Sequence, residues 1–236
     1  MNLSQRSYQK EFLDEDFLPF ADIRQNMKEL NFINKWLGGH GISIDAFRQL
    51  LKDKREISIC EIGCGGGDNL VAISNWCRKK NIKLTVTGID LKKECIDFAK
   101  SRADKFLDVT WITSDYKKVG FKKKPDIIFS SLFCHHFTNE ELECQFKWMS
   151  ENSGIGFFIN DLQRNILAYY SIKLLTRLFS NSYLVKNDAP LSVARGFNRD
   201  ELIAICRKAN IGNTTITWKW AFRYLIIYQN DARGSL

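Results

Sequence analysis

Residues 59–70 read I-C-E-I-G-C-G-G-G-D-N-L, an apolar run that passes through four glycines into a polar start. The run is typical of a buried strand ending near Glu61, and the residues from Asp68 onward have the pattern of an amphipathic helix. A glycine turn between strand and helix brings backbone N–H groups and the positive helix end close to a ligand, because no Cβ intervenes. This stretch therefore predicts an α/β fold with a ligand-binding loop after its first strand.

The same alternation continues along the chain. Apolar runs at 57–62, 84–89, 109–113, 126–131 and 156–160 are separated by amphipathic segments around 68–80, 92–106 and 139–149. Strands that alternate with helices form a parallel sheet covered on both faces. Two later runs, 214–220 and 222–228, are separated too briefly for a parallel crossover, so they predict an antiparallel hairpin after a capped helix that starts near Asn198.

The remaining segments flank or interrupt this pattern. Residues 1–52 predict an N-terminal helical arm or lid, and residues 53–236 the main domain. Within that domain, residues 162–196 predict an insertion, with a long helix over 163–179 and irregular chain over 181–196, which contains Pro190. The inserted helix is apolar on several sides, so it lines a substrate pocket, forms a dimer contact or joins the core.

Composition limits the kinds of partner. The formal net charge is +8, but the lysines are spread along the chain, which favours a solvated basic surface over a nucleic-acid partner. No apolar run is long enough to span a membrane, and no leader pattern begins the chain, so a cytoplasmic protein is expected. Seven cysteines without a C-x-x-C pair predict a reducing compartment and no metal site.

The spacing of the glycines separates two classes of nucleotide-binding loop. Dinucleotide-binding proteins space them as G-x-G-x-x-G, but here Asp68 occupies the third glycine position and the pattern is E-x-G-x-G-x-G. This loop resembles that of the class I S-adenosylmethionine (SAM)-dependent methyltransferases. Asp90, after T-V-T-G-I, and Asp115, after W-I-T-S, stand at two further stations of that family, in order.

The resemblance implies a Rossmann-like, seven-stranded, mostly parallel sheet of order 3-2-1-4-5-7-6 with its last strand antiparallel. It also implies SAM as cofactor and S-adenosylhomocysteine (SAH) as product. Asp90 would take the ribose hydroxyls, Asp115 the adenine amine, and Tyr116 or Leu91 the adenine ring. The implied cofactor residues are Glu61, Gly63, Cys64, Gly65, Asp90, Leu91, Asp115, Tyr116 and Ser131. The alternatives are that Asp90 caps the helix beginning near Lys92 and that Asp115 is an ordinary turn residue. Each aspartate taken singly favours the cofactor role only modestly, whereas the two together with the loop favour it clearly.

Further motifs narrow the class of acceptor molecule by resemblance. The fourth strand leads into S-S-L-F, without the prolines typical of enzymes that methylate exocyclic amines, and then into L-F-C-H-H-F. The second motif is similar to that of the ubiquinone and menaquinone methyltransferase-like group. Residues 34–39, 159–164 and 191–197 resemble a bacterial subgroup associated with type III polyketide synthases or with aryl-polyene and resorcinol pigment clusters. The implied reaction is O- or C-methylation of a phenolic, quinol or polyketide-derived small molecule.

Candidate catalytic residues follow the fourth strand. We expect one of His135 and His136 to face the substrate as a general base, with a preference for His135, and the other to pack or cap. Candidate substrate-binding residues near the end of the fifth strand are Asn160, Asp161, Arg164 and Tyr169. Alternatively, Asp161 caps the inserted helix and pairs with Arg164. The competing functions are an RNA methyltransferase and a non-catalytic partner-binding protein, and the protein is a candidate homodimer.

Overall fold

The computed structural model describes residues 3–15, 18–102 and 108–230, and its centre is a seven-stranded sheet. The strands are β1 (Glu56–Ile62), β2 (Lys83–Asp90), β3 (Asp108–Thr113), β4 (Ile127–Ser131), β5 (Gly156–Leu162), β6 (Thr214–Lys219) and β7 (Arg223–Gln229). Their order is β3-β2-β1-β4-β5-β7-β6. Strands β1 to β5 pair in parallel, whereas β7 runs antiparallel to both β5 and β6. The predicted order and hairpin are confirmed.

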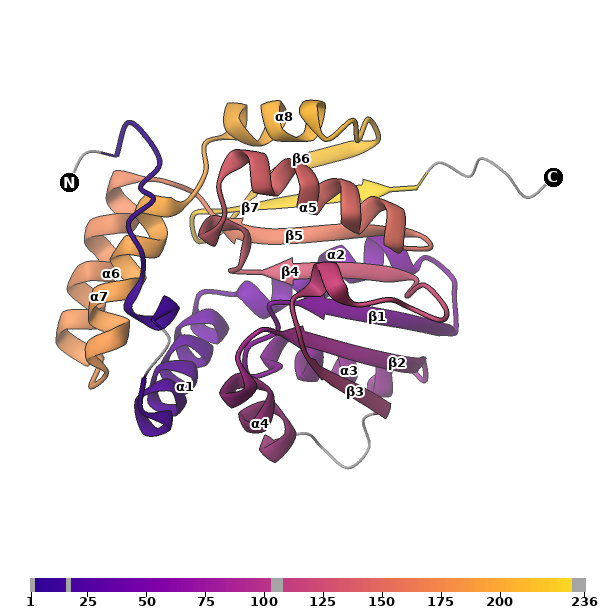
Figure 1. Cartoon of the computed structure of the whole chain (residues 1–236), viewed down its shortest axis with the longest axis horizontal. Helices are drawn as coiled ribbons and strands as arrows, with labels where there is room; N and C mark the ends of the chain where they lie inside the picture. Colours follow the sequence, from indigo (N-terminus) through magenta and orange to yellow (C-terminus); the bar gives the residue numbers. More distant parts are fainter. Residues whose placement is uncertain (1–2, 16–17, 103–107, 231–236) are drawn as a thin grey trace.

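Helices cover both faces of the sheet (Figure 1). One face carries α2 (Gly39–Leu51), α3 (Asp68–Lys79) and α4 (Lys93–Arg102), and the other carries α5 (Asn139–Asn152) and α8 (Arg199–Lys208). Phe47 of α2 and Phe146 of α5 are fully buried on opposite faces. Each buried phenylalanine contributes about 1.5–3 kcal/mol relative to an exposed one, so these two layers hold most of the core together.

The predicted N-terminal arm divides into two parts. Helix α2 packs in the core against α3, β5 and β7, because Phe47, Leu50 and Leu51 are buried there. Helix α1 (Phe20–Trp36) instead lies across the carboxyl ends of the strands, in contact with α4 and α7. A short 3₁₀ helix, η1 (Phe12–Asp14), precedes it. The part of the arm that is placed to cover a site is therefore residues 3–15 and 18–36.

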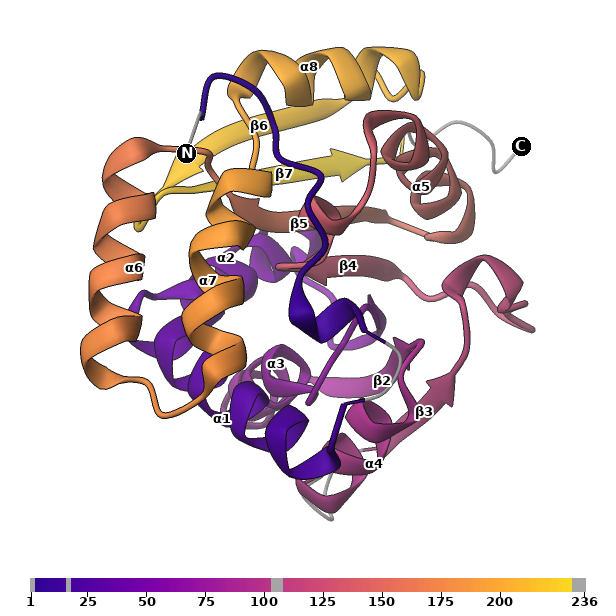
Figure 2. The same cartoon turned by 60° about the vertical axis from the view of Figure 1, so that its left-hand side comes forward.

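The insertion forms a helical hairpin beyond the carboxyl ends of the strands, made of α6 (Ile166–Phe179) and α7 (Tyr183–Arg195) (Figure 2). The prediction of irregular chain over 181–196 is wrong. The Ser182 hydroxyl caps α7 by accepting from the Val185 N–H, and Leu184 and Ala194 are fully buried. Pro190 removes a bond to the Lys186 carbonyl, but that residue is exposed to water, so packing outweighs the loss.

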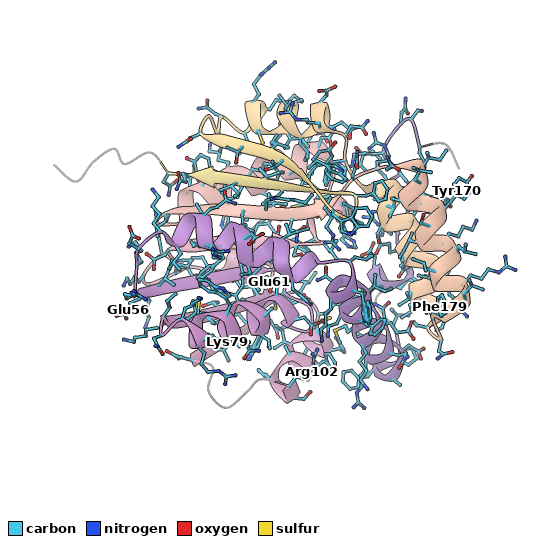
Figure 3. The ribbon with its side chains drawn as sticks, turned by 180° about the vertical axis from the view of Figure 1, so that it is seen from behind. Glu56, Glu61, Lys79, Arg102, Tyr170 and Phe179 are labelled. Atoms are coloured by element: carbon cyan, nitrogen blue, oxygen red, sulfur yellow. The ribbon has the colours of Figure 1, made fainter. Side chains whose placement is uncertain are left out.

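Helix α6 begins three residues later than predicted, because the Asn165 side chain accepts from the Leu167 and Ala168 N–H groups. Its outer face is apolar and exposed, as Figure 3 shows at Tyr170 and Phe179. Two further 3₁₀ turns, η2 (Tyr116–Lys118) and η3 (Cys134–His136), follow β3 and β4. Within the described residues, no helix is both long and apolar enough to cross a membrane.

Candidate active site

The glycine loop joins β1 to α3 at the carboxyl edge of the sheet. The Cys64 N–H donates to the Ile89 carbonyl (3.1 Å), which fixes the loop to β2. Gly63 has φ +64°, and a Cβ there would lie 2.2 Å from the Phe133 ring. Gly65 has φ +50°, and a Cβ there would meet no atom within 4 Å. A glycine is therefore required at Gly63 by packing, whereas Gly65 faces open space.

That open space belongs to a cavity of about 400 Å³ between the loop and α1, which we call the loop cavity. Seven of the predicted cofactor residues line it: Glu61, Gly63, Cys64, Gly65, Asp90, Leu91 and Ser131. Figure 3 shows Glu61 at the end of β1 that faces α1. Asparagines from two helices also line it, namely Asn26, Asn31, Asn34 and Asn69. The sequence reasoning missed these four, because amides on a helix carry no motif.

Several polar atoms in the loop cavity have no partner within the protein. Glu61 Oε1 accepts from Asn69 Nδ2 (3.2 Å), but Glu61 Oε2 is buried and unpaired. The Ser131 hydroxyl and both side-chain polar atoms of Asn26 are also buried without a partner. Burial raises the pKa of Glu61 well above its ordinary value, since nothing cationic faces it. A ligand that donates hydrogen bonds at this edge would satisfy these groups.

Asp90 accepts backbone hydrogen bonds, as a capping residue does, and it also lines the loop cavity. Its Oδ2 accepts from the Gly65 N–H (2.8 Å) and its Oδ1 from the Lys92 N–H (2.9 Å), so it orders both the loop and the turn into α4. Burial raises its pKa, although these backbone bonds oppose the shift. Because each carboxylate oxygen has a second lone pair, Asp90 remains able to accept from hydroxyls in the loop cavity.

Two predicted cofactor residues are placed elsewhere. Asp115 caps η2 by accepting from the Lys117 N–H (3.0 Å). Tyr116 is buried, with its ring packed edge-on against Phe133 and Trp148. Among the described residues that line the loop cavity, neither appears, so contacts of Asp115 and Tyr116 with an adenine ring stay a prediction. Leu91 does line it, and its side chain is 73% exposed, so it remains the candidate that packs on a ring.

A second, mostly apolar cavity of about 340 Å³ lies beside the first, and we call it the apolar cavity. It is enclosed by α1, α6, α7 and the turn before β7, through side chains that include Ile33, Ile172, Leu175, Val193 and Phe222. Five residues line both cavities: Leu13, Leu30, Asn34, Leu132 and His136. The two spaces therefore adjoin, and His136 stands on their common wall.

Both histidines face the apolar cavity, which corrects the expectation that one would point away. They are consecutive residues of the η3 turn, and their ring centroids are 4.4 Å apart. His135 Nδ1 pairs with Asp161 Oδ1 (2.7 Å) and His136 Nδ1 with Asp14 Oδ1 (3.1 Å). Burial lowers the pKa of His135, but the Asp161 and Glu11 carboxylates outweigh it and raise it to about 9. Without a ligand, His135 is thus a cation rather than a base at neutral pH.

Asp161 organises this turn. One of its oxygens, Oδ2, accepts from the Phe133 and Cys134 N–H groups (3.1 and 2.7 Å), while Oδ1 holds His135. Burial opposes ionisation, but His135 and these donors lower the Asp161 pKa to about 2. It therefore neither caps the inserted helix nor pairs with Arg164, and it acts on the cavity through His135.

Two arginines fix the backbone of the same turn. Arg195 donates to the His135 and His136 carbonyls (3.1 and 2.9 Å) and to Asp14 Oδ2 (3.1 Å). Arg6 donates to the Phe137 carbonyl (2.9 Å) and to Asn139 Oδ1 (2.7 Å). The motif at 191–197 thus supplies a clamp for the histidine turn.

The other predicted substrate residues serve the scaffold. Asn160 is fully buried and donates to the Gly39 carbonyl (3.0 Å), which ties β5 to α2. Arg164 pairs with Glu201 (2.6 Å) and donates to the Gly196 carbonyl (2.7 Å). Tyr169 packs between α6 and α7. Of the described residues that line the two cavities, none is one of these three, so they do not belong to the candidate site.

Sequence reasoning missed Glu11 and Asp14, which reach the histidines from the N-terminal segment (Figure 2). That segment is docked on α7, where Asp188 accepts from the Phe12 and Leu13 N–H groups (2.9 and 3.0 Å). The local pattern around E-F-L-D carries no signal for a contact with His136, which lies more than 120 residues further along the chain.

The region that contains the glycine loop matches a known protein family. Residues 59–151 match the model of the methyltransferase domain family. No curated protein sequence matches the chain.

Solved structures show the likeness over a longer range. A SAM-dependent methyltransferase from Aquifex aeolicus is 16% identical, with 90% of this chain and 99% of that chain covered and a TM-score of 0.61. The plantazolicin methyltransferase in complex with SAH is 17% identical, with 90% and 89% covered and a TM-score of 0.63. Human N-acetylserotonin methyltransferase in complex with SAM is 14% identical, with a TM-score of 0.65. The match to the human enzyme takes in 91% of this chain but 57% of that longer one. The fold of this chain is therefore the Rossmann-like fold of the class I methyltransferases.

Proposed function

We propose that the protein is a SAM-dependent methyltransferase whose acceptor is a small phenolic, quinol or polyketide-derived molecule, methylated on oxygen or carbon. One observation carries the proposal: the loop cavity and the apolar cavity share a wall. A donor in the first space and an acceptor in the second would meet beside His136. The match of residues 59–151 to the methyltransferase domain family supports the donor chemistry.

The residues around the loop cavity fit this cofactor. Glu61 Oε2, buried and unpaired, suits the amino group of the methionine moiety. Asp90 suits the ribose hydroxyls, and the absence of a side chain at Gly65 lets the ligand approach the backbone. The exposed Leu91 side chain suits the adenine ring. Bound SAM would supply an activated methyl group on a sulfonium.

The chain's own contribution is positioning and exclusion of water. The apolar cavity holds an aromatic or acyl acceptor in a mostly nonpolar surrounding, and His136 stands where the two spaces meet. With a phenol acceptor, the new oxygen–carbon bond would form as the carbon–sulfur bond breaks, SAH would leave, and the phenol proton would go to solvent water. His135 and His136 both line the apolar cavity, so their imidazoles are the polar groups placed to orient the acceptor oxygen.

Asp90→Ala tests the cofactor site. The substitution should weaken SAM and SAH binding about 100-fold or more in calorimetry, because two hydrogen bonds to a carboxylate are lost at about 1.5–3 kcal/mol each. Asp97→Ala, on the exposed side of α4, should leave binding unchanged. Binding by the wild type then justifies a screen of phenols and quinols for SAH formation. Wild-type protein that binds neither compound would instead indicate a non-catalytic scaffold, and turnover of RNA alone would indicate the competing enzyme.

The affinity for SAM should also depend on pH through Glu61. In the free protein burial raises the pKa of Glu61, which favours its protonated form. A bound ammonium stabilises the carboxylate and releases that proton. Affinity should therefore rise with pH until it passes the pKa of the free protein, and then level off. Glu61→Gln should flatten this dependence in calorimetry; an unchanged slope would contradict the assigned contact.

A further inference from the structure

Three side chains at the inner end of the apolar cavity converge as a set of metal ligands. One ligand atom from each of Glu11, His135 and His136 lies within 4.8 Å of the other two. Glu11 Oε1 is 3.6 Å from His135 Nε2, and Glu11 Oε2 is 3.8 Å from His136 Nε2. An ion about 2.1 Å from each ligand would set tetrahedral ligands about 3.4 Å apart. We propose that these three residues bind one divalent first-row transition-metal ion.

The second nitrogen of each imidazole supports this assignment. His135 Nδ1 pairs with Asp161 (2.7 Å) and His136 Nδ1 with Asp14 (3.1 Å). Metal-binding histidines commonly donate from the nitrogen that does not bind the metal to a carboxylate, which fixes the tautomer and the ring orientation. Both histidines have such a carboxylate partner at Nδ1. In both, Nε2 points toward the Glu11 carboxylate.

The ligands are held in place before an ion arrives. The Ser192 hydroxyl donates to Glu11 Oε1 (2.7 Å), and Asp188 binds the backbone on the C-terminal side of Glu11. Arg195 holds the carbonyls of both histidines. The side chains of Glu11 and His135 are almost fully buried and hence already ordered, so the site loses little entropy on binding an ion.

Charge favours a dication at this position. The charges in direct contact with the two imidazoles are the carboxylates of Glu11, Asp14 and Asp161. Arg195 pairs with Asp14, and Arg6 and Arg223 act on Asp161 through longer-range charge. Two neutral imidazoles and a carboxylate suit zinc, iron, cobalt or nickel better than magnesium or calcium, which prefer an all-oxygen set. The cysteine pattern predicted no metal site, because it carries no signal from ligands at positions 11, 135 and 136.

Three protein ligands leave coordination positions open toward the apolar cavity. If the proposed methyltransferase function holds, an anionic oxygen of the acceptor, such as a phenolate, would occupy one of them. The ion would lower the pKa of a bound phenol and orient its oxygen toward the loop cavity, with the released proton going to solvent. The favoured acceptor is then a phenol rather than a carbon nucleophile.

The test measures metal binding directly and does not need the acceptor. Full-length protein treated with a chelator and then titrated with Zn²⁺ in a calorimeter should bind one equivalent, and with Co²⁺ should develop visible absorption bands. Glu11→Gln and His136→Gln should each weaken binding at least about 100-fold, and Asp14→Asn about 10- to 100-fold. His40→Gln removes the third histidine of the chain, which pairs with asparagines instead, and should bind as the wild type does.

Thermal melting of each variant separates loss of a ligand from loss of the fold. Wild-type protein that binds no stoichiometric ion, or an equal loss in His40→Gln, would overturn the metal site. If the protein bound SAM normally but bound no metal ion, the metal site would be refuted and the methyltransferase proposal would stand. Metal binding without SAM binding would support the site and refute the methyltransferase.

Discussion

Replacing Asp161 by alanine is expected to lower the free energy of unfolding by about 4 kcal/mol. The buried carboxylate accepts from two backbone N–H groups and one histidine, and Arg6 and Arg223 lie within its electrostatic reach. Removing one partner of a buried charged network costs about 3–5 kcal/mol, because the remaining charges and donors stay desolvated. Urea denaturation monitored by circular dichroism would measure the change.

Asp161→Asn keeps the volume and one acceptor oxygen but loses the charge, so its cost should be smaller, about 2 kcal/mol. Asp97→Ala, at an exposed position, should stay within about 0.5 kcal/mol of the wild type. Equal stability of Asp161→Ala and the wild type would mean that the η3 turn is held by the two arginines alone.

Gly63→Ala should both destabilise the protein and abolish cofactor binding. The new Cβ would overlap the Phe133 ring, in a backbone conformation that L-residues rarely adopt. The left-handed conformation costs about 1–2 kcal/mol and overpacking about 1–3 kcal/mol, so a loss of roughly 3 kcal/mol is expected. Phe133 belongs to the wall of the loop cavity, so its displacement would also distort the site.

Gly65→Ala is the matched comparison, since its Cβ would enter open space in the same loop. It should cost about 1–2 kcal/mol of stability from the backbone alone. The larger effect should be on SAM binding in calorimetry, because the methyl group occupies volume that the ligand needs. If Gly65→Ala bound SAM normally, the loop cavity would not be the cofactor site.

The sequence predicted the sheet well because its signals are local. Each apolar run and each amphipathic segment is readable within a few residues, and the short connection before Arg223 already requires an antiparallel hairpin. Residues 183–195 were mispredicted for the opposite reason. Their helix is stabilised by burial of Leu184 and Ala194 against other elements, and Pro190 gives a contrary local signal.

The residues of the candidate site divide in the same way, into those that a local signal predicts and those that only tertiary contacts place. Glu61, Gly65 and Asp90 were predictable because the carboxyl ends of parallel strands meet at one edge. The inward packing of Tyr116 was not, since side-chain direction after a strand end depends on neighbours such as Trp148. Glu11 joins the histidines through contacts with α7, which no local pattern encodes.

The histidine turn is clamped by residues from both ends of the described chain, Arg6 and Asp14 on one side and Arg195 on the other. During synthesis the early residues leave the ribosome long before position 195 is translated. At roughly 5–20 residues per second this delay is on the order of 10–40 s. Strands β1 to β5 can form during that time, but β6 and β7 follow position 195 in the chain, so the last strands of the sheet and the clamp on the histidine turn should both form late.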